Sequence, residues 1–255
     1  MTLSDDVLET RALSRDFAGF VAVDRVDLRV RRNTIHALIG PNGAGKTTFF
    51  NLLTKFLAPT SGTILYNGRD ITAERPAAVA RRGLVRSFQI SATFPHLSVL
   101  ENVRIALQRK VGDAFRFWRS ERVLENLNGR ALELLGWVGL ADFAGLQAAE
   151  LPYGRKRALE IATTLALEPE LMLLDEPTSG LGHEDVGMIA DLIQRIAANR
   201  TILMVEHNLG VVARLSHRIT VLARGCVLAD GTYDEISRNP EVRTAYIGTL
   251  VASGS

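Results

Sequence analysis

The sequence predicts an α/β fold in which a parallel sheet forms the core and a helical segment interrupts it. Short, predominantly apolar segments at residues 35–39, 171–174 and 202–205 are typical of parallel strands buried on both faces. A glycine-rich turn, residues 40–45, joins the first of these strands to a helical pattern, as in α/β units. Between residues 97 and 166, apolar residues recur at helical intervals with few strand signals.

Composition and charge exclude several classes of protein. The chain has 255 residues, of which 47% are hydrophobic and 23% charged, so it can bury a sizeable core and is not a disordered chain. The longest stretch without Asp, Glu, Lys or Arg is the 14 residues 87–100. A membrane-spanning helix needs roughly 20 mostly apolar residues. The net charge of +2, from 30 basic and 28 acidic residues, argues against a protein that binds nucleic acid by bulk charge.

The N-terminus and the single cysteine bear on the cellular compartment. Three acidic residues stand near the N-terminus with no apolar run after them, so we expect no secretory signal. Cys226 cannot form an intramolecular disulfide. Its apolar neighbours predict a small buried side chain in a reducing compartment.

The N-terminal elements follow from alternation and turn signals. Broken alternation of valine and leucine with charged residues over 21–30 predicts half-buried antiparallel strands. After the buried strand 35–39 and its glycine turn, residues 46–56 have helical spacing. Pro59, Ser61 and Gly62 predict a turn, followed by a strand at 63–66 that ends at Asn67-Gly68.

The middle and C-terminal parts complete the predicted organisation. Three helices are expected in the middle, with these apolar residues: Val99, Val103, Ala106 and Leu107; Leu132, Leu135, Val138 and Leu140; Leu159, Ala162, Leu165 and Ala166. Strand and helix then alternate again, with strands at 171–174, 202–205 and 219–223 and an amphipathic helix over 186–197. We therefore expect a core made of residues 1–90 and 166–240, a helical subdomain over 91–165, and a tail over 241–255.

A complete phosphate-binding motif lies between the strand at 35–39 and the next helix. Its residues are Gly40, Pro41, Asn42, Gly43, Ala44, Gly45, Lys46 and Thr47. The glycines let backbone N–H groups converge on phosphate oxygens, and the helix directs its positive end at the same anion. Lys46 adds a full charge for the β- and γ-phosphates, and the Thr47 hydroxyl can ligate Mg²⁺. A chance glycine turn does not account for a complete motif in this context, which predicts a P-loop NTPase without separating GTPases, kinases, helicases and transporter motors.

Two acids end the strand at 171–174. A strand end places Asp175 beside the phosphate loop, where it can hold Mg²⁺ through water. Glu176, one residue further, can face the γ-phosphate and orient the attacking water as a general base. The alternative, a solvated acidic turn, is less favoured because a phosphate loop stands upstream.

Further features follow these motifs in a fixed order: Gln89, a helix start at Leu151-Pro152-Tyr153-Gly154-Arg155-Lys156-Arg157, the loop 177–181, and His207. With them, the chain resembles the nucleotide-binding subunit of ABC transporters across nearly all of its length. Alone, Gln89 or His207 is more often an ordinary polar residue. The resemblance implies one ABC ATPase domain with a RecA-like P-loop core, a mixed sheet, an N-terminal antiparallel β subdomain and an inserted α-helical subdomain.

The resemblance also implies roles for individual residues. Glu176, His207 and Gln89 would be catalytic, with His207 touching the γ-phosphate. Thr47, Gln89 and Asp175 would hold Mg²⁺. For the ATP bound by its own subunit, the implied contacts are Phe17 against adenine and the residues from Gly40 to Thr48, so that Thr48 is added to the motif. Tyr153, Gly154 and Arg155 would contact the ATP that is bound by the opposite subunit. For Phe17, a core aromatic is an equally good interpretation.

A narrower resemblance rests on the segments 39–48, 85–89, 153–154, 159–162, 205–208 and 239–248. These look like the branched-chain amino acid importer ATPases, and ATPases of urea and amide importers and of lipopolysaccharide export are very similar. This resemblance implies a second ABC ATPase subunit, identical or related, and integral membrane permease subunits as partners, an indirect link to a periplasmic binding protein, and a peripheral place on the cytoplasmic face of the membrane. The transported molecule is not readable from this subunit. Rival interpretations are a soluble ABC-type ATPase acting on DNA or ribosomes and a nucleotide-binding regulator without turnover.

Three residues depart from the family pattern. Pro152 and Arg155 replace the Ser and Gln of the usual L-S-G-G-Q signature, and Gly182 replaces an Asp or Asn. Pro152 has neither the hydroxyl nor the backbone N–H that could bond a phosphate. A lost hydrogen bond to a charged group weakens binding about ten- to a hundred-fold. We expect hydrolysis to persist and ATP-driven dimerisation to be weakened or tuned.

Overall fold

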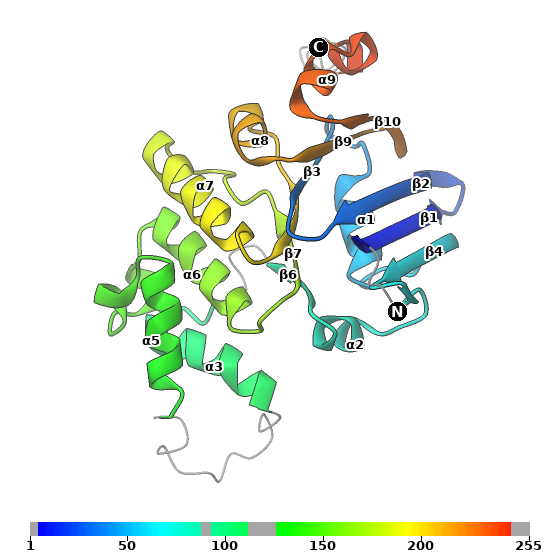
Figure 1. Ribbon diagram of the computed structural model, residues 1–255. Helices are drawn as coiled ribbons and strands as arrows, with labels where there is room; N and C mark the ends of the chain where they lie inside the picture. The colour runs from blue at the N-terminus through cyan, green and yellow to red at the C-terminus, as the bar shows by residue number, and fades with distance from the viewer. Residues whose placement is uncertain (1–4, 88–92, 112–125, 246–255) are drawn as a thin grey trace.

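Six strands form the main sheet of the computed structural model, which describes residues 5–87, 93–111 and 126–245 (Figure 1). The strand order is β10-β9-β3-β8-β7-β6, with β10 antiparallel and the others parallel. The strands are β3 (Ile35–Ile39), β6 (Leu84–Ser87), β7 (Leu171–Asp175), β8 (Thr201–Val205), β9 (Arg218–Ala223) and β10 (Cys226–Gly231). The predicted mixed, largely parallel sheet is therefore confirmed.

A second, antiparallel sheet is built from the N-terminal part of the chain. Its order is β2-β1-β4-β5, with β1 (Asp6–Phe17), β2 (Phe20–Arg31), β4 (Ser61–Tyr66) and β5 (Arg69–Asp70). Figure 1 shows this sheet and α1 (Lys46–Leu53) on one side of β3, with α7 (His183–Ala197) and α8 (Leu209–Leu215) on the other. The main sheet is thus covered on both faces, as its predominantly apolar strands require.

Each face of the main sheet has its own core. Along β7, Met172 and Leu174 belong to the core under the helices, while Leu171 and Leu173 belong to the core shared with α1 and the antiparallel sheet. All four side chains are completely buried. Side chains alternate between the two faces of the sheet along this strand. The sequence does not reveal the alternation, because both faces are apolar.

The register brings the carboxyl ends of three strands to one edge of the sheet. Asp175 at the end of β7 lies opposite Val205 at the end of β8, and Leu38 of β3 also lies opposite Val205. The loops after these strands therefore meet at one place. Ligands of open α/β sheets bind outside this edge.

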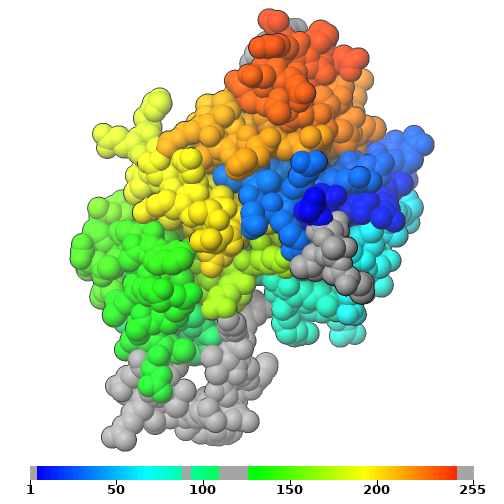
Figure 2. All heavy atoms as spheres, viewed as in Figure 1, coloured from blue at the N-terminus to red at the C-terminus, as the bar shows by residue number. Residues whose placement is uncertain are grey.

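Three helices from the middle of the chain pack on one another beside the sheet: α3 (Val99–Val111), α5 (Asn128–Trp137) and α6 (Tyr153–Leu165). Figure 2 shows α5 and its neighbours, in green, as a lobe next to the yellow residues of α7. Their apolar residues join the core under the sheet. Within the described ranges, the structure contains no helix long and apolar enough to cross a membrane.

The remaining short elements complete the chain. They are α2 (Pro76–Arg81), α9 (Tyr233–Arg238) and two 3₁₀ turns, Ala141–Phe143 and Ala148–Glu150. The tail residues 246–255 lie outside the described part.

Four local expectations were wrong. The first helix ends at Leu53 rather than residue 56, because Lys55 has a left-handed φ of 64°. The strand expected at 63–66 starts at Ser61. Leu132 is exposed, because α5 buries Ala131, Leu134 and Leu135 and ends before Val138 and Leu140. Cys226 is exposed as the first residue of β10, directly after a turn.

Candidate nucleotide-binding site

The phosphate loop joins β3 to α1 and is packed against two other segments. Gly40, Gly43 and Gly45 have φ values of 153°, 75° and 100°, which disfavour residues with a Cβ. A Cβ on Gly40 would lie 2.2 Å from the carbonyl oxygen of Leu222, and one on Gly45 2.4 Å from that of Ala22. Backbone packing therefore requires glycine at both positions, and the residue at position 45 leads directly into the helix.

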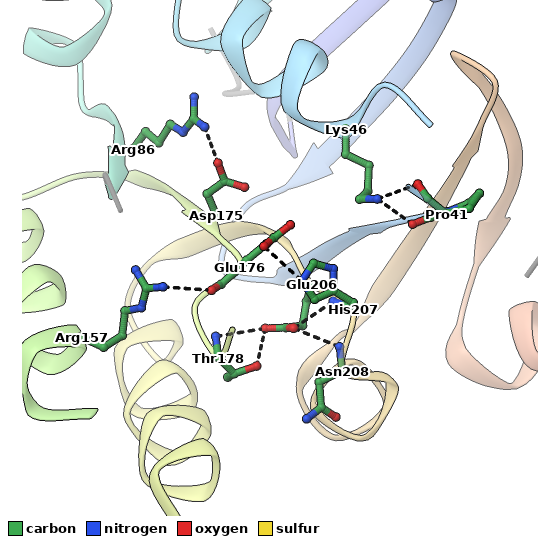
Figure 3. A network of polar contacts seen from close by, with 11 residues as sticks. Pro41, Lys46, Arg86, Arg157, Asp175, Glu176, Thr178, Glu206, His207 and Asn208 are labelled. Atoms are coloured by element: carbon green, nitrogen blue, oxygen red, sulfur yellow. Dashed lines mark hydrogen bonds and ion pairs between the residues drawn. The ribbon is translucent and has the colours of Figure 1, made fainter. Parts of the chain in front are cut away.

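Lys46 folds back into this loop. Its Nζ donates hydrogen bonds to the carbonyl oxygens of Gly40, at 2.6 Å, and Pro41, at 2.9 Å. Burial lowers the pKa of the Lys46 amine, and the carboxylates of Glu176 and Asp175 act in the opposite direction. The ammonium group is thus buried inside the loop and near both acids, which come from the end of β7 (Figure 3).

Asp175 is nearly buried and paired with an arginine that sequence reasoning did not single out. Its Oδ2 accepts a hydrogen bond from Nη2 of Arg86 in β6. Nη1 of Arg86 donates to Oδ1 of Asn51 in α1, at 2.6 Å. Arg86 therefore links the acidic strand end to the helix that starts at the phosphate loop.

Glu176 and His207 lie side by side, as the prediction of a common site requires. The Nε2 atom of His207 is 3.1 Å from Oε2 of Glu176. Both side chains are partly open to solvent, with exposed fractions of 46% and 27% respectively. The backbone of Glu176 is left-handed, with φ of 48°. Figure 3 shows the two side chains next to each other, below Lys46 in this view.

Glu206 fixes the two loops that flank this pair. Its Oε1 accepts from the backbone N–H groups of His207, at 2.9 Å, and Asn208, at 3.0 Å. Its Oε2 accepts from the Thr178 hydroxyl at 2.7 Å and from the Thr178 backbone N–H at 3.3 Å. The carboxylate is buried, so these donors hold it, and it in turn ties the loop after Glu176 to the loop that carries His207.

The predicted signature residues open helix α6. Pro152 is its N-cap and provides no side-chain cap. The Tyr153 hydroxyl lies close to Gly180, and the carboxylate of Asp185 lies against Gly154, where a Cβ would meet it at 2.4 Å. These contacts join the start of α6 to the loop after β7 and to α7.

The other predicted site residues make no hydrogen bond or ion pair with Glu176 or His207 within the described ranges, and their local surroundings are as follows. The Phe17 ring, partly exposed, lies beneath the Arg15 guanidinium at 4.5 Å. Arg155 stacks on Phe143 at 4.0 Å, and Thr47 is exposed at the start of α1. Gln89 lies outside the described residues.

The residues present suit a nucleotide with a bound divalent cation. The phosphate loop supplies backbone N–H groups and an ammonium group for polyphosphate. Asp175 and Thr47 supply the carboxylate and hydroxyl oxygens that Mg²⁺ prefers. Among the described residues, no cluster of three or more His, Cys, Asp or Glu is placed to hold a metal ion.

Sequence reasoning missed four contributors to the site: Arg86, Arg157, Glu160 and Glu206. The Nη2 atom of Arg157 in α6 is 3.3 Å from the Glu176 carbonyl oxygen, and its Nη1 is 2.7 Å from Oε2 of Glu160. The available signal was a charged residue within or beside a run of apolar residues. Glu206, between a buried strand and His207, was the most visible case.

Two protein families match this chain. The ABC transporter family matches residues 23–179, and the branched-chain amino acid ATP-binding cassette transporter family matches residues 226–252. The chain is 39% identical to the high-affinity branched-chain amino acid transport ATP-binding protein LivG of Escherichia coli K12, over 96% of this chain and 99% of that protein. It is 38% identical to BraF of Pseudomonas aeruginosa, which carries the same description, over the same shares.

Solved structures agree with these relatives. The ADP conformation of MJ1267, an ATP-binding cassette of an ABC transporter, has a TM-score of 0.84 and 27% identity, covering 95% of this chain and 99% of that one. The dimeric structure of MJ0796, a bacterial ABC transporter cassette, has a TM-score of 0.74 and 26% identity, covering 89% and 98%. The chain therefore belongs to the ABC transporter family, as an ATP-hydrolysing subunit of the branched-chain amino acid type.

Proposed function

We propose that this subunit uses ATP, held with Mg²⁺, to drive the import of branched-chain amino acids or a related amino acid or amide. The observation that carries the proposal is the meeting of Lys46, Asp175, Glu176 and His207 outside one edge of the sheet. The cation, held by Thr47, Asp175 and Gln89, would neutralise charge on the phosphates.

Each residue of the site has a distinct role in the proposed reaction. Backbone N–H groups of the phosphate loop and Lys46 bind the β- and γ-phosphates. Glu176 accepts a proton from the attacking water, and His207 orients the Glu176 carboxylate and contacts the γ-phosphate. Lys46 leaves the carbonyl oxygens of Gly40 and Pro41 as phosphate oxygens replace them.

The nucleotide would be enclosed between two subunits. Tyr153, Gly154 and Arg155, at the start of α6, would face the nucleotide of a second ABC ATPase subunit. Support comes from the dimeric cassette that this chain resembles and from the position of Gly154 at a helix N-terminus, where anions bind. A shared nucleotide stabilises the closed dimer by mass action.

Integral membrane permease subunits would be the second partner. The exposed ring of Phe94, beside α3 and close in sequence to Gln89, marks the proposed contact. We also propose a place on the cytoplasmic face of the membrane and an indirect link to a periplasmic binding protein; the similarity to the LivG and BraF transport proteins supports both. The match at residues 226–252 supports the amino acid type.

Reconstitution of the transporter in vesicles tests the proposed substrate. The subunit, its permease and its binding protein are combined, and ATP turnover is measured with leucine, urea or no ligand on the binding protein. The proposal predicts stimulation by leucine and accompanying leucine uptake. Stimulation by urea alone, or turnover that is independent of the permease, would contradict it.

A further inference from the structure

Arg157 connects helix α6 to the backbone that carries Glu176. Its Nη2 donates to the carbonyl oxygen of Glu176 at 3.3 Å, and its Nη1 donates to Oε2 of Glu160 at 2.7 Å. The side chains of Arg157 and Glu160 are only 7% and 2% exposed, so water does not screen these contacts. Figure 3 shows the guanidinium group pointing at the Glu176 backbone.

The backbone of Glu176 needs this support. A left-handed φ of 48° is unfavourable for a residue with a Cβ and persists only where the surroundings fix it. The Glu176 N–H donates to the Val205 carbonyl at 2.9 Å, and its carbonyl also accepts from the Ser179 N–H at 3.1 Å. Among the groups that hydrogen-bond to the Glu176 backbone, Arg157 is the charged donor. It lies on helix α6, whereas the other partners lie on β8 and on the loop after Glu176.

The buried ion pair is a poor source of stability by itself. The Nε atom of Arg157 and Oε1 of Glu160 are buried without a hydrogen-bond partner among the described residues. Burial raises the pKa of Glu160, while Arg157 lowers it. A half-satisfied buried pair contributes little net stability, which favours a role in positioning the groups that it contacts.

We propose that Arg157 is a positioning residue for hydrolysis, which couples the position of α6 to the orientation of Glu176. Gly154 lies three residues earlier on the same helix. Under the proposed function, on which this coupling rests, Gly154 faces the nucleotide bound by the partner subunit. A nucleotide there fixes the start of α6 and, through Arg157, the base in this subunit's own site.

The test compares Arg157→Lys and Arg157→Gln with wild type in the assembled transporter. We expect both to lower kcat about tenfold, as for loss of one charged hydrogen bond, with KM for ATP within about twofold. The Hill coefficient for ATP should fall toward one. Arg157→Lys keeps a positive charge beside Glu160, so its thermal midpoint should remain near wild type.

Arg130→Gln is the matched control, because it removes an exposed i, i+3 ion pair with Glu133 on α5. It should leave kcat unchanged. Wild-type kcat in both Arg157 variants would overturn the proposal, as would a fall of kcat in Arg157→Lys that merely follows a fall in thermal stability. The variant-to-wild-type ratio is also measured on the cassette without permease, so a wrong assignment of partner or substrate would leave this test intact.

Discussion

Two successive carboxylates in this site have different surroundings. Asp175 is buried and paired with Arg86, whereas Glu176 is partly open to solvent and paired with His207. A buried carboxylate with a fixed cationic partner suits a cation site, and a carboxylate with access to water suits a base. These surroundings support the proposed roles, with Asp175 as a cation ligand and Glu176 as the general base.

Replacing Glu176 by Gln tests whether Glu176 is the general base. The amide keeps the shape of the side chain and cannot accept the proton, so kcat should fall about 10²- to 10⁴-fold. ATP affinity should stay within about twofold, because the phosphate loop is intact. Steady-state turnover and equilibrium binding of a fluorescent ATP analogue measure the two quantities.

Glu133→Gln, on the exposed face of α5, is the control and should behave as wild type. Retained turnover in Glu176→Gln would remove this residue as the base. Weakened binding together with lost turnover would instead indicate a structural role.

Sequence alone identified the contiguous motifs and missed the residues that support them. Lys46, Asp175 and Glu176 are marked by a complete motif and by a strand that ends in two acids. Arg86 is 89 positions from its partner Asp175, so only the pairing of β6 with β7 brings them together. Arg157 was noted within the signature but given no role, because its contact with Glu176 depends on how α6 lies against the sheet.

Among the elements, the strands β3, β7 and β8 inside the main sheet were predicted, whereas its edge strands β6 and β10 and the irregular strand β1 were not. The strands β3, β7 and β8 are short and predominantly apolar, and each was predicted. Strand β1 was not identified separately, because its pairing with β2 contains register shifts and Ala12 has a φ of 45°. Bulges shift the alternation that a sequence pattern relies on.

A buried histidine in β3 predicts an acid-dependent stability. Nε2 of His36 is hydrogen-bonded to the Thr220 hydroxyl at 2.8 Å, and that hydroxyl is bonded to Asp230. Burial lowers the pKa of His36 to about 4; Asp230 raises it and Arg218 lowers it further. The unfolded chain, with a histidine pKa near 6.5, therefore binds more protons between the two values, so stability is lost as pH falls through this window.

The free energy of unfolding should decrease by about 2 kcal/mol more in wild type than in His36→Gln between pH 7 and pH 5. Chemical denaturation at both pH values measures the difference. Equal decreases in the two proteins would show that His36 does not titrate differently on folding.

The start of α6 gives a second prediction for an element. Pro152 as N-cap provides no oxygen for the helix and no hydroxyl for a phosphate. Pro152→Ser should tighten ATP-dependent dimerisation about tenfold, and Pro152→Ala, which restores only the N–H, should do less. Sedimentation with ATP compares the three proteins, and an unchanged affinity and turnover in Pro152→Ser would refute the idea.

At the scale of the whole molecule, one apolar core continues from the main sheet into the helical layer. Leu159 and Leu165 of α6 and Val103 of α3 belong to the same core as Met172 of β7. The α/β class and the inserted helices were predictable because periodicity changes along the chain. How closely the layer joins the sheet was not, because packing between helices leaves no contiguous pattern.

The shared core bears on how a displacement passes between the helical layer and the sheet. A helix that shares a core with the sheet moves as a packed body rather than as a loose attachment. Gly154 and Arg157 lie on that helix, so we expect a change at the proposed dimer contact to alter the orientation of Glu176.

The central claim is that polyphosphate is bound by the loop amides together with the ammonium group of Lys46. The most direct measurement is the ATP affinity and turnover of Lys46→Ala in the assembled transporter, with Arg130→Gln as control. The account predicts ATP binding weakened at least about tenfold, by loss of a charged contact, and turnover close to background. Normal binding and hydrolysis in Lys46→Ala would contradict it.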